Sequence, residues 1–158
     1  MKVVQAGSVV VRAAGRAERG DPVSKPLVLV VDDQPGVRRL LFEAFHDDGF
    51  EVELASGGAE ALRKLRYVHP AVVLLDLRMP GLSGLDTLRE IRERMPDLKV
   101  VIMTAYGEMD MVREAQEMGV QWYLTKPFDL GELRCLLGTV MDGVAVAEVQ
   151  EGEIVAAT

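Results

Sequence analysis

The chain has 158 residues, of which 49% are hydrophobic and 27% are charged, and its net charge at pH 7 is −7. This length suits one domain with a substantial core, and the acidic balance argues against a dedicated DNA-binding protein, because such proteins carry a basic face. The chain has no run of about 18 apolar residues, which excludes a typical membrane-spanning helix, and the single Cys135 excludes an internal disulfide, so we expect a cytoplasmic protein.

The chain divides into a central domain and two terminal segments. Residues 1–26 begin with Lys2 and an interrupted apolar stretch, which three arginines follow. We expect this segment to be a basic, flexible tail, or the result of a start codon assigned too early, rather than a signal peptide. We assign residues 27–142 to one domain and residues 143–158 to a C-terminal tail that is too short for a second domain.

In chain order, the central domain alternates strand-like segments with helix-like ones. Short apolar or alternating runs predict strands over 27–31, 50–55, 71–76, 98–104 and 120–125. Between them, apolar residues at helical spacing that stop at Gly or Pro predict helices over 37–49, 56–69, 83–96, 108–119 and 129–141. Ser56 is the expected N-cap of the second helix.

This alternation predicts a doubly wound α/β fold with five parallel strands and five helices. In such sheets the functional site lies beyond the carboxyl ends of the strands. Several polar residues occupy these ends and are expected to meet at one edge of the sheet: Asp32, Asp33, Asp76, Thr104, Thr125 and Lys126.

These polar groups indicate the chemistry of the expected site. Three converging carboxylates repel one another unless a positive charge lies between them. Because Asp32, Asp33 and Asp76 offer oxygen ligands, we expect a hard divalent cation there, Mg²⁺ or Mn²⁺. Lys126 adds a charge suited to phosphate and Thr104 adds a hydroxyl donor. A nucleophile, a metal, a cation and a neutral donor are the parts that phosphoryl transfer requires.

Four segments resemble motifs of the receiver domain of two-component response regulators: VVDDQ, LLDLRMPGLSG, IMTAYG and YLTKPFD, in this order. The resemblance covers roughly residues 27–140 and implies a flavodoxin-like fold. It implies that Asp76 is the phosphoacceptor and takes a phosphoryl group from phosphohistidine. The protein would then be a signalling protein that catalyses its own phosphotransfer and slow autodephosphorylation, rather than an enzyme acting on another substrate.

The resemblance also implies which groups hold the metal. Asp33, Asp76 and the backbone carbonyl of Arg78 would bind Mg²⁺ directly. Asp32 would lie nearby, with a water molecule as its link to the ion. Because only its carbonyl would be used, the side chain at position 78 would be free to vary.

Further residues would contact the phosphoryl group or respond to it. The resemblance implies that Lys126 pairs with the phosphoryl group, that the Lys126–Pro127 bond is cis, and that Thr104 is a switch hydroxyl. Tyr123 would be the aromatic residue coupled to that switch. The alternative for Tyr123 is a plain core role, because an aromatic residue in a strand usually packs inside.

Three segments, DDQPGVRRLLFEAF, MTAYGEMDM and KPFDLGELR, resemble more narrowly the single-domain regulators of sporulation phosphorelays. Such a regulator takes phosphate from a sensor histidine kinase or a histidine phosphotransferase and passes it to a second phosphotransferase. This implies a monomer with protein partners and with no nucleic-acid or membrane partner. The alternatives are a chemotaxis-type regulator that acts by phosphorylation-dependent protein binding, and a phosphate sink.

The start of the first helix and the loop after Lys126 are the expected docking surface for a phosphohistidine domain. The residues that the relay resemblance places there are Gln34, Val37, Leu40, Pro127 and Phe128. The alternative is that the whole apolar stripe of the first helix belongs to the core.

Arg78 and Tyr106 follow Asp76 and Thr104 by two residues each. Both side chains are bulky, and we expect them to shield the acyl phosphate from water and to lengthen its lifetime. Arg78 also argues against an aspartyl-phosphate phosphatase, which needs a second Asp at that position. A nucleotide-binding module is disfavoured because the first strand lacks a Gly-rich loop after it.

Overall fold

The computed structural model describes residues 2–5, 25–142, 146–150 and 153–156. Its main sheet has five parallel strands in the order β3-β2-β4-β5-β6. These strands are β2 (Leu27–Val31), β3 (Glu51–Ala55), β4 (Val72–Asp76), β5 (Lys99–Ala105) and β6 (Trp122–Lys126). The helices between and after them are α1 (Pro35–Asp47), α2 (Gly58–Lys64), α3 (Gly84–Arg94), α4 (Met109–Glu117) and α5 (Leu130–Asp142). The predicted doubly wound fold is confirmed.

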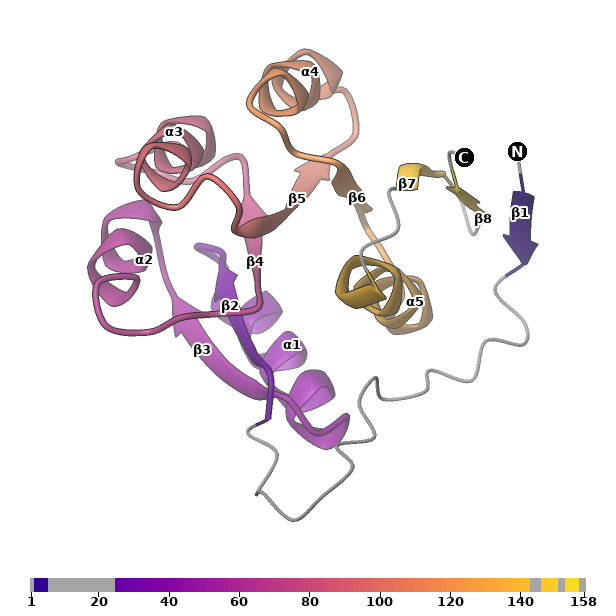
Figure 1. Ribbon diagram of the computed structural model, residues 1–158, viewed down its shortest axis with the longest axis horizontal. Helices are drawn as coiled ribbons and strands as arrows, with labels where there is room; N and C mark the ends of the chain where they lie inside the picture. The colour runs from indigo at the N-terminus through magenta and orange to yellow at the C-terminus, as the bar shows by residue number, and fades with distance from the viewer. Residues whose placement is uncertain (1, 6–24, 143–145, 151–152, 157–158) are drawn as a thin grey trace.

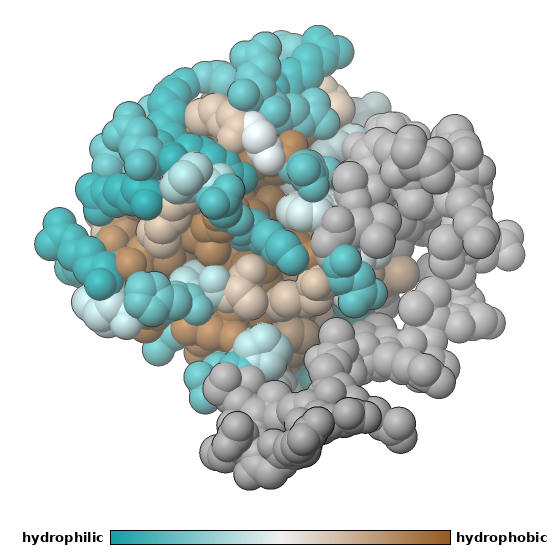
Figure 2. Space-filling view, in the orientation of Figure 1, coloured by the Kyte–Doolittle hydropathy of each residue, from teal (hydrophilic) through white to brown (hydrophobic). Residues whose placement is uncertain are grey.

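Helices cover both faces of the sheet (Figure 1). Helices α2, α3 and α4 pack on one face, and α1 and α5 pack on the other. All five residues of β4 are buried, as expected for a central strand with helices on both sides. Figure 2 shows hydrophilic side chains over the outer surfaces of α2, α3 and α4 and hydrophobic ones between the two helical layers. The core therefore consists of two apolar layers separated by the sheet.

Local sequence explains where several helices begin. Pro35 lies in the first turn of α1, where its missing N–H costs no hydrogen bond. At the start of α3, the Ser83 hydroxyl accepts a hydrogen bond from the Asp86 N–H at 3.1 Å. The expectation that Ser56 caps α2 is wrong: the N-cap is Gly57, and the Ser56 hydroxyl donates to the Glu60 carboxylate at 2.7 Å instead.

Gly84 allows α3 to begin directly against the end of β4. A Cβ at this position would lie 2.4 Å from the carbonyl oxygen of Asp76 and 2.5 Å from the Cα of Leu77. Both are backbone atoms, so no side-chain rotation relieves the clash. The Gly84 N–H also donates to the Leu77 carbonyl at 3.1 Å. The path of the loop after Asp76 therefore requires a residue without a side chain at position 84.

The two terminal segments contain three short strands that the sequence analysis did not predict. They are β1 (Lys2–Gln5), β7 (Val146–Gln150) and β8 (Glu153–Ala156), and they form an antiparallel sheet in the order β1-β8-β7. Valine is frequent in these stretches, which suits extended backbone. Apart from Lys25 and Pro26, the remaining residues of both segments lie outside the described residues, so the assigned domain limits and the flexible tail stay predictions. Within the described ranges, no helix has the length and apolar character needed to cross a membrane.

Candidate functional site

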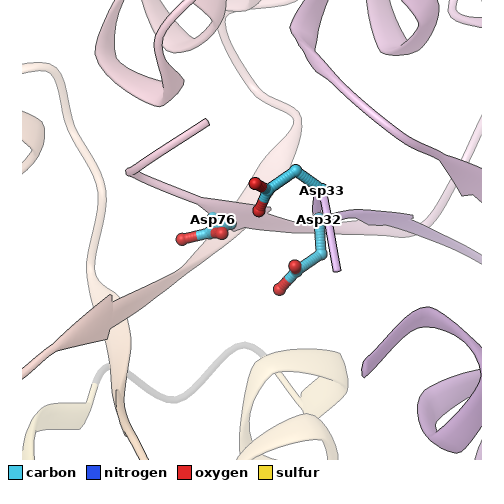
Figure 3. A group of neighbouring side chains, drawn as sticks. All are labelled: Asp32, Asp33 and Asp76. Atoms are coloured by element: carbon cyan, nitrogen blue, oxygen red, sulfur yellow. The ribbon is translucent and has the colours of Figure 1, made fainter. Parts of the chain in front are cut away.

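Three aspartates meet at the carboxyl ends of two neighbouring strands (Figure 3). Asp32 and Asp33 directly follow β2, and Asp76 is the last residue of β4. Strands β2 and β4 pair in parallel, with Val31 opposite Leu75, so the three residues lie side by side. One carboxylate oxygen from each of the three lies within 4.8 Å of the others. The predicted acidic cluster is therefore present in the folded chain.

The cluster is shielded from solvent and is held by a small set of donors. Asp32 is fully buried, Asp76 is 6% exposed, and Asp33 is half-buried. The Asp32 carboxylate accepts from the Gln34 N–H at 2.9 Å and from the Lys126 ammonium at 2.6 Å. These contacts compensate part of the cost of burying the Asp32 charge.

Asp76 has a weaker set of partners. Its carboxylate accepts from the Arg78 N–H at 3.3 Å and lies 3.5 Å from the Lys126 ammonium. Burial raises the pKa of Asp76 to about 6, and the Asp32 and Asp33 charges add to this effect. Lys126 and the Arg78 N–H act in the opposite direction without cancelling it. Asp76 is thus a carboxylate whose charge is poorly compensated in the absence of a further cation.

The donor set fits a hard divalent cation. Asp32, Asp33 and Asp76 supply only oxygen ligands, and three carboxylates against the single ammonium of Lys126 leave an excess of negative charge. A bound Mg²⁺ or Mn²⁺ would offset that excess. The residues present therefore suit the predicted metal.

Thr104 lies at the end of β5, and its side chain is buried. Its hydroxyl donates to a carboxylate oxygen of Glu108 at 2.7 Å, and the Ala105 N–H donates to the same oxygen at 2.9 Å. The other oxygen of Glu108 lies 2.5 Å from the Nε of Arg78. Sequence reasoning missed Glu108, although its place four residues after Thr104 and just before a helix was a usable signal.

The remaining predicted site residues lie on β6 or in the loops just after β4, β5 and β6. The Lys126–Pro127 bond is cis, as the resemblance implies. Tyr123 is buried on β6 in the core layer that faces α2, α3 and α4. Tyr106 is 95% exposed and follows the end of β5. The Arg78 side chain is also mostly exposed, although it reaches Glu108.

The predicted docking residues come from the start of α1 and from the loop between β6 and α5. Gln34 and Pro127 are exposed, and Leu40 is 48% exposed. Val37 and Phe128 are half-buried and pack against the core layer beneath α1 and α5. Leu41, Ala44 and Phe45 of α1 are buried, so only part of the apolar stripe belongs to the core.

Comparisons with known proteins agree with this architecture. The family model for the response regulator receiver domain matches residues 28–137. Sporulation initiation phosphotransferase F from Bacillus subtilis is 41% identical over 107 residues, which cover 68% of this chain and 86% of that protein. The response regulator TrrA from Thermotoga maritima, solved in complex with Mg(2+)-BeF, has 35% sequence identity and a TM-score of 0.66, covering 73% of this chain and 98% of that one.

Other relatives are much longer than the matched region. The regulatory protein AtoC from Escherichia coli is 43% identical over 110 residues, which cover 70% of this chain but only 24% of AtoC. The match therefore extends to one quarter of that relative. This similarity therefore gives no information about the activity of the remaining three quarters of AtoC.

Proposed function

The chain belongs to the family of response regulator receiver domains, and on that premise we propose that it accepts a phosphoryl group from phosphohistidine on Asp76 and passes it on in a phosphorelay. In this proposal it acts as a stand-alone, monomeric signalling protein. Its partners are a sensor histidine kinase, a histidine phosphotransferase, or both. Neither nucleic acid nor a membrane is a partner.

One observation carries the proposal: a poorly compensated carboxylate lies beside two further carboxylates and an ammonium group. Asp76 has one oxygen within 4.8 Å of oxygens of Asp32 and Asp33, and it lies 3.5 Å from the Lys126 ammonium. This arrangement combines a nucleophile with a cation suited to phosphate. It supports phosphoryl transfer over a purely structural role for the cluster.

The proposed reaction requires Mg²⁺, which Asp33, Asp76 and the Arg78 carbonyl would hold, with Asp32 nearby. When bound, the ion neutralises negative charge on the carboxylates and the phosphoryl oxygens. A carboxylate oxygen of Asp76 attacks phosphorus, so that a P–O bond forms while the P–N bond to the donor histidine breaks. The imidazole leaves with the electron pair of that bond. Lys126 and Thr104 then contact the phosphoryl oxygens, and Tyr123 follows Thr104.

The relay role rests on similarity and on the predicted docking residues. The match covers 86% of sporulation initiation phosphotransferase F, whose name describes a phosphotransferase. Gln34 lies in the loop after β2, Val37 and Leu40 follow on α1, and Pro127 and Phe128 lie in the loop after β6. A phosphohistidine domain seated there would reach Asp76 from the open edge of the sheet.

Onward transfer tests the relay role. The protein is phosphorylated on Asp76, separated from its donor, and mixed with a histidine phosphotransferase domain. The relay predicts that label moves to the histidine domain faster than it is lost to water, and that Leu40→Ala slows this movement. Loss of label to water alone would contradict the relay and favour the chemotaxis-type alternative. The Mg(2+)-BeF group seen in the Thermotoga relative provides a probe of the site that needs no phosphodonor.

A further inference from the structure

The loop between β5 and α4 contains a carboxylate that holds the hydroxyl of Thr104. We propose that Glu108 is a positioning residue that retains Thr104 in the unphosphorylated state and thereby opposes occupancy of the phosphoryl site. The proposal rests on the proposed function, because it concerns how Thr104 becomes available to a group on Asp76. We name the contacts among Thr104, Ala105, Glu108 and Arg78 the Glu108 bridge.

The Glu108 bridge joins three parts of the chain. Glu108 is the N-cap residue of α4, and its side chain turns back to the end of β5. One oxygen accepts from the Thr104 hydroxyl at 2.7 Å and from the Ala105 N–H at 2.9 Å. The other oxygen lies 2.5 Å from the Nε of Arg78, which follows β4. Glu108 is only 7% exposed, so solvent competes little for these contacts.

The chemistry of the hydroxyl makes the two states of Thr104 exclusive. A threonine hydroxyl has one proton to donate. While that proton is shared with Glu108, it is not available to a phosphoryl oxygen. The bond to Glu108 is charge-assisted, and such bonds are about twice as strong as neutral ones. Formation of the Thr104–phosphoryl contact therefore requires the loss of a strong buried bond.

The bridge has consequences beyond Thr104. The Glu108 carbonyl accepts from the Met111 and Val112 N–H groups, so Glu108 also belongs to the first turn of α4. The ion pair with Glu108 keeps the Arg78 side chain near the start of α4 and restricts its movement toward Asp76. Release of Thr104 would thus loosen the start of α4 and Arg78 together. This couples the phosphoryl site to a surface helix through contacts that exist before phosphorylation.

Binding of beryllofluoride at saturating Mg²⁺, followed by ¹⁹F NMR, tests the proposal. Glu108→Gln keeps the size of the side chain and replaces a charged acceptor with a neutral one. We expect it to tighten beryllofluoride binding by about tenfold, because the resting state loses its preference for Thr104. Damage to the fold would weaken binding instead. The matched control is Glu114→Gln, which removes the charge of another α4 glutamate that pairs with an arginine, Arg89, and should leave the affinity unchanged.

A double-mutant cycle separates the bridge from simple charge repulsion. In the Thr104→Ala background there is no hydroxyl to release, so Glu108→Gln should have no effect on affinity. An equal tightening in both backgrounds would overturn the proposal, since it would show that Glu108 acts through its charge or through Arg78 and not through Thr104. If wild type fails to bind beryllofluoride, the proposed function fails. If wild type binds and Glu108→Gln binds equally well, only the bridge fails.

A measurement on the wild-type protein covers the case in which Glu108→Gln does not fold. The Ala105 N–H shares its acceptor oxygen with Thr104, so its ¹⁵N–¹H resonance reports on the bridge. We expect this resonance to move on saturation with Mg²⁺ and beryllofluoride. If Mg²⁺ and beryllofluoride saturate the site and the ¹⁵N–¹H resonances of Ala105 and Glu108 do not shift, the proposal is overturned.

Discussion

The ammonium group of Lys126 lies 2.6 Å from a carboxylate oxygen of Asp32, a residue 94 positions away in the chain. The same ammonium lies 3.5 Å from Asp76. In this state Lys126 is therefore mainly the counter-ion of the fully buried Asp32 and only secondarily a partner of Asp76. Accepting a phosphoryl group on Asp76 would draw Lys126 toward a new anion.

Loss of this cation should change the titration of Asp76. Lys126 lowers the pKa of Asp76 against the larger effect of burial, so Lys126→Met should raise that pKa further above about 6. Titration of the Asp76 carboxyl by ¹³C NMR measures the change. Lys99→Met is the control, because Lys99 begins β5, at the opposite end of the sheet, and donates to the Val140 carbonyl. A pKa that stays the same or falls in Lys126→Met would contradict the described role of Lys126.

The buried charge of Asp76 should also make the protein less stable at neutral pH. The pKa of Asp76 rises from 3.8 to about 6 on folding, so between these values the native state holds a proton that the unfolded chain has lost. The free energy of unfolding therefore falls as the pH rises through that window. A difference of this size corresponds to about 3 kcal/mol above pH 6, without divalent cations.

Asp76→Asn removes that cost. We expect it to raise the free energy of unfolding at pH 7.5 by about 1–3 kcal/mol relative to wild type, and the difference to disappear near pH 4. Urea unfolding at several pH values in EDTA measures it. A variant that is less stable than wild type at pH 7.5 would show that the Asp76 charge is well compensated in the folded state.

Mg²⁺ should stabilise the protein through the aspartates. A ligand that binds only the native state raises the unfolding temperature with its concentration. We expect Mg²⁺ to raise the unfolding temperature of wild type and to have a clearly smaller effect on Asp33→Asn. The control is Asp47→Asn, which changes an exposed aspartate on α1. Equal responses of all three proteins to Mg²⁺ would place the ion elsewhere.

Gly84 should tolerate no side chain. A Cβ at this position meets backbone atoms of Asp76 and Leu77, so we expect Gly84→Ala to lower the free energy of unfolding by roughly 1–3 kcal/mol. Gly138→Ala is the matched control, since a Cβ there meets no described atom within 4 Å on α5. It should be neutral or stabilising by about 0.5–1 kcal/mol. Chemical denaturation of both variants gives the comparison, and equal effects would refute the packing argument.

Shielding of the acyl phosphate is a separate expectation. Tyr106 is 95% exposed and the Arg78 side chain pairs with Glu108. We expect both side chains to cover the phosphoryl group once it is bound to Asp76. Arg78→Ala and Tyr106→Ala should each shorten the lifetime of the labelled protein, measured as loss of label in the absence of partners. Tyr106→Ala leaves the Glu108 bridge intact and so isolates the shielding effect. Unchanged lifetimes in both variants would refute it.

The strand ends were the most predictable part of this protein. Apolar runs that stop at Asp32 and Asp76 place these carboxylates at the carboxyl end of a parallel sheet. The parallel direction and length of the strands largely determine where their last residues lie. Lys126 was predictable for the same reason. These residues are positioned by the sheet itself, and the sheet follows from the hydrophobic pattern.

Features that depend on loops were not predictable in this way. The N-cap of α2 is Gly57, and the Ser56 hydroxyl bonds to the Glu60 carboxylate instead of capping the helix. The hydrophobic pattern of the sequence does not show which of these two hydrogen bonds Ser56 forms. Glu108 contacts Thr104 because the loop after β5 folds back, and Gly84 is required because α3 starts against the backbone of β4. Both contacts depend on how closely two segments approach each other, and hydrophobic periodicity gives no information about such distances.

Transfer of a labelled phosphoryl group from a phosphorylated histidine-kinase core would decide whether Asp76 is the phosphoacceptor. Wild type, Asp76→Asn and the control Asp47→Asn are each incubated with the donor, in Mg²⁺ and in EDTA. We expect Mg²⁺-dependent labelling of wild type and Asp47→Asn, and no labelling of Asp76→Asn. Labelling of Asp76→Asn at the wild-type level would show that the acceptor is another residue, and equal labelling of wild type in EDTA would show that the reaction needs no Mg²⁺.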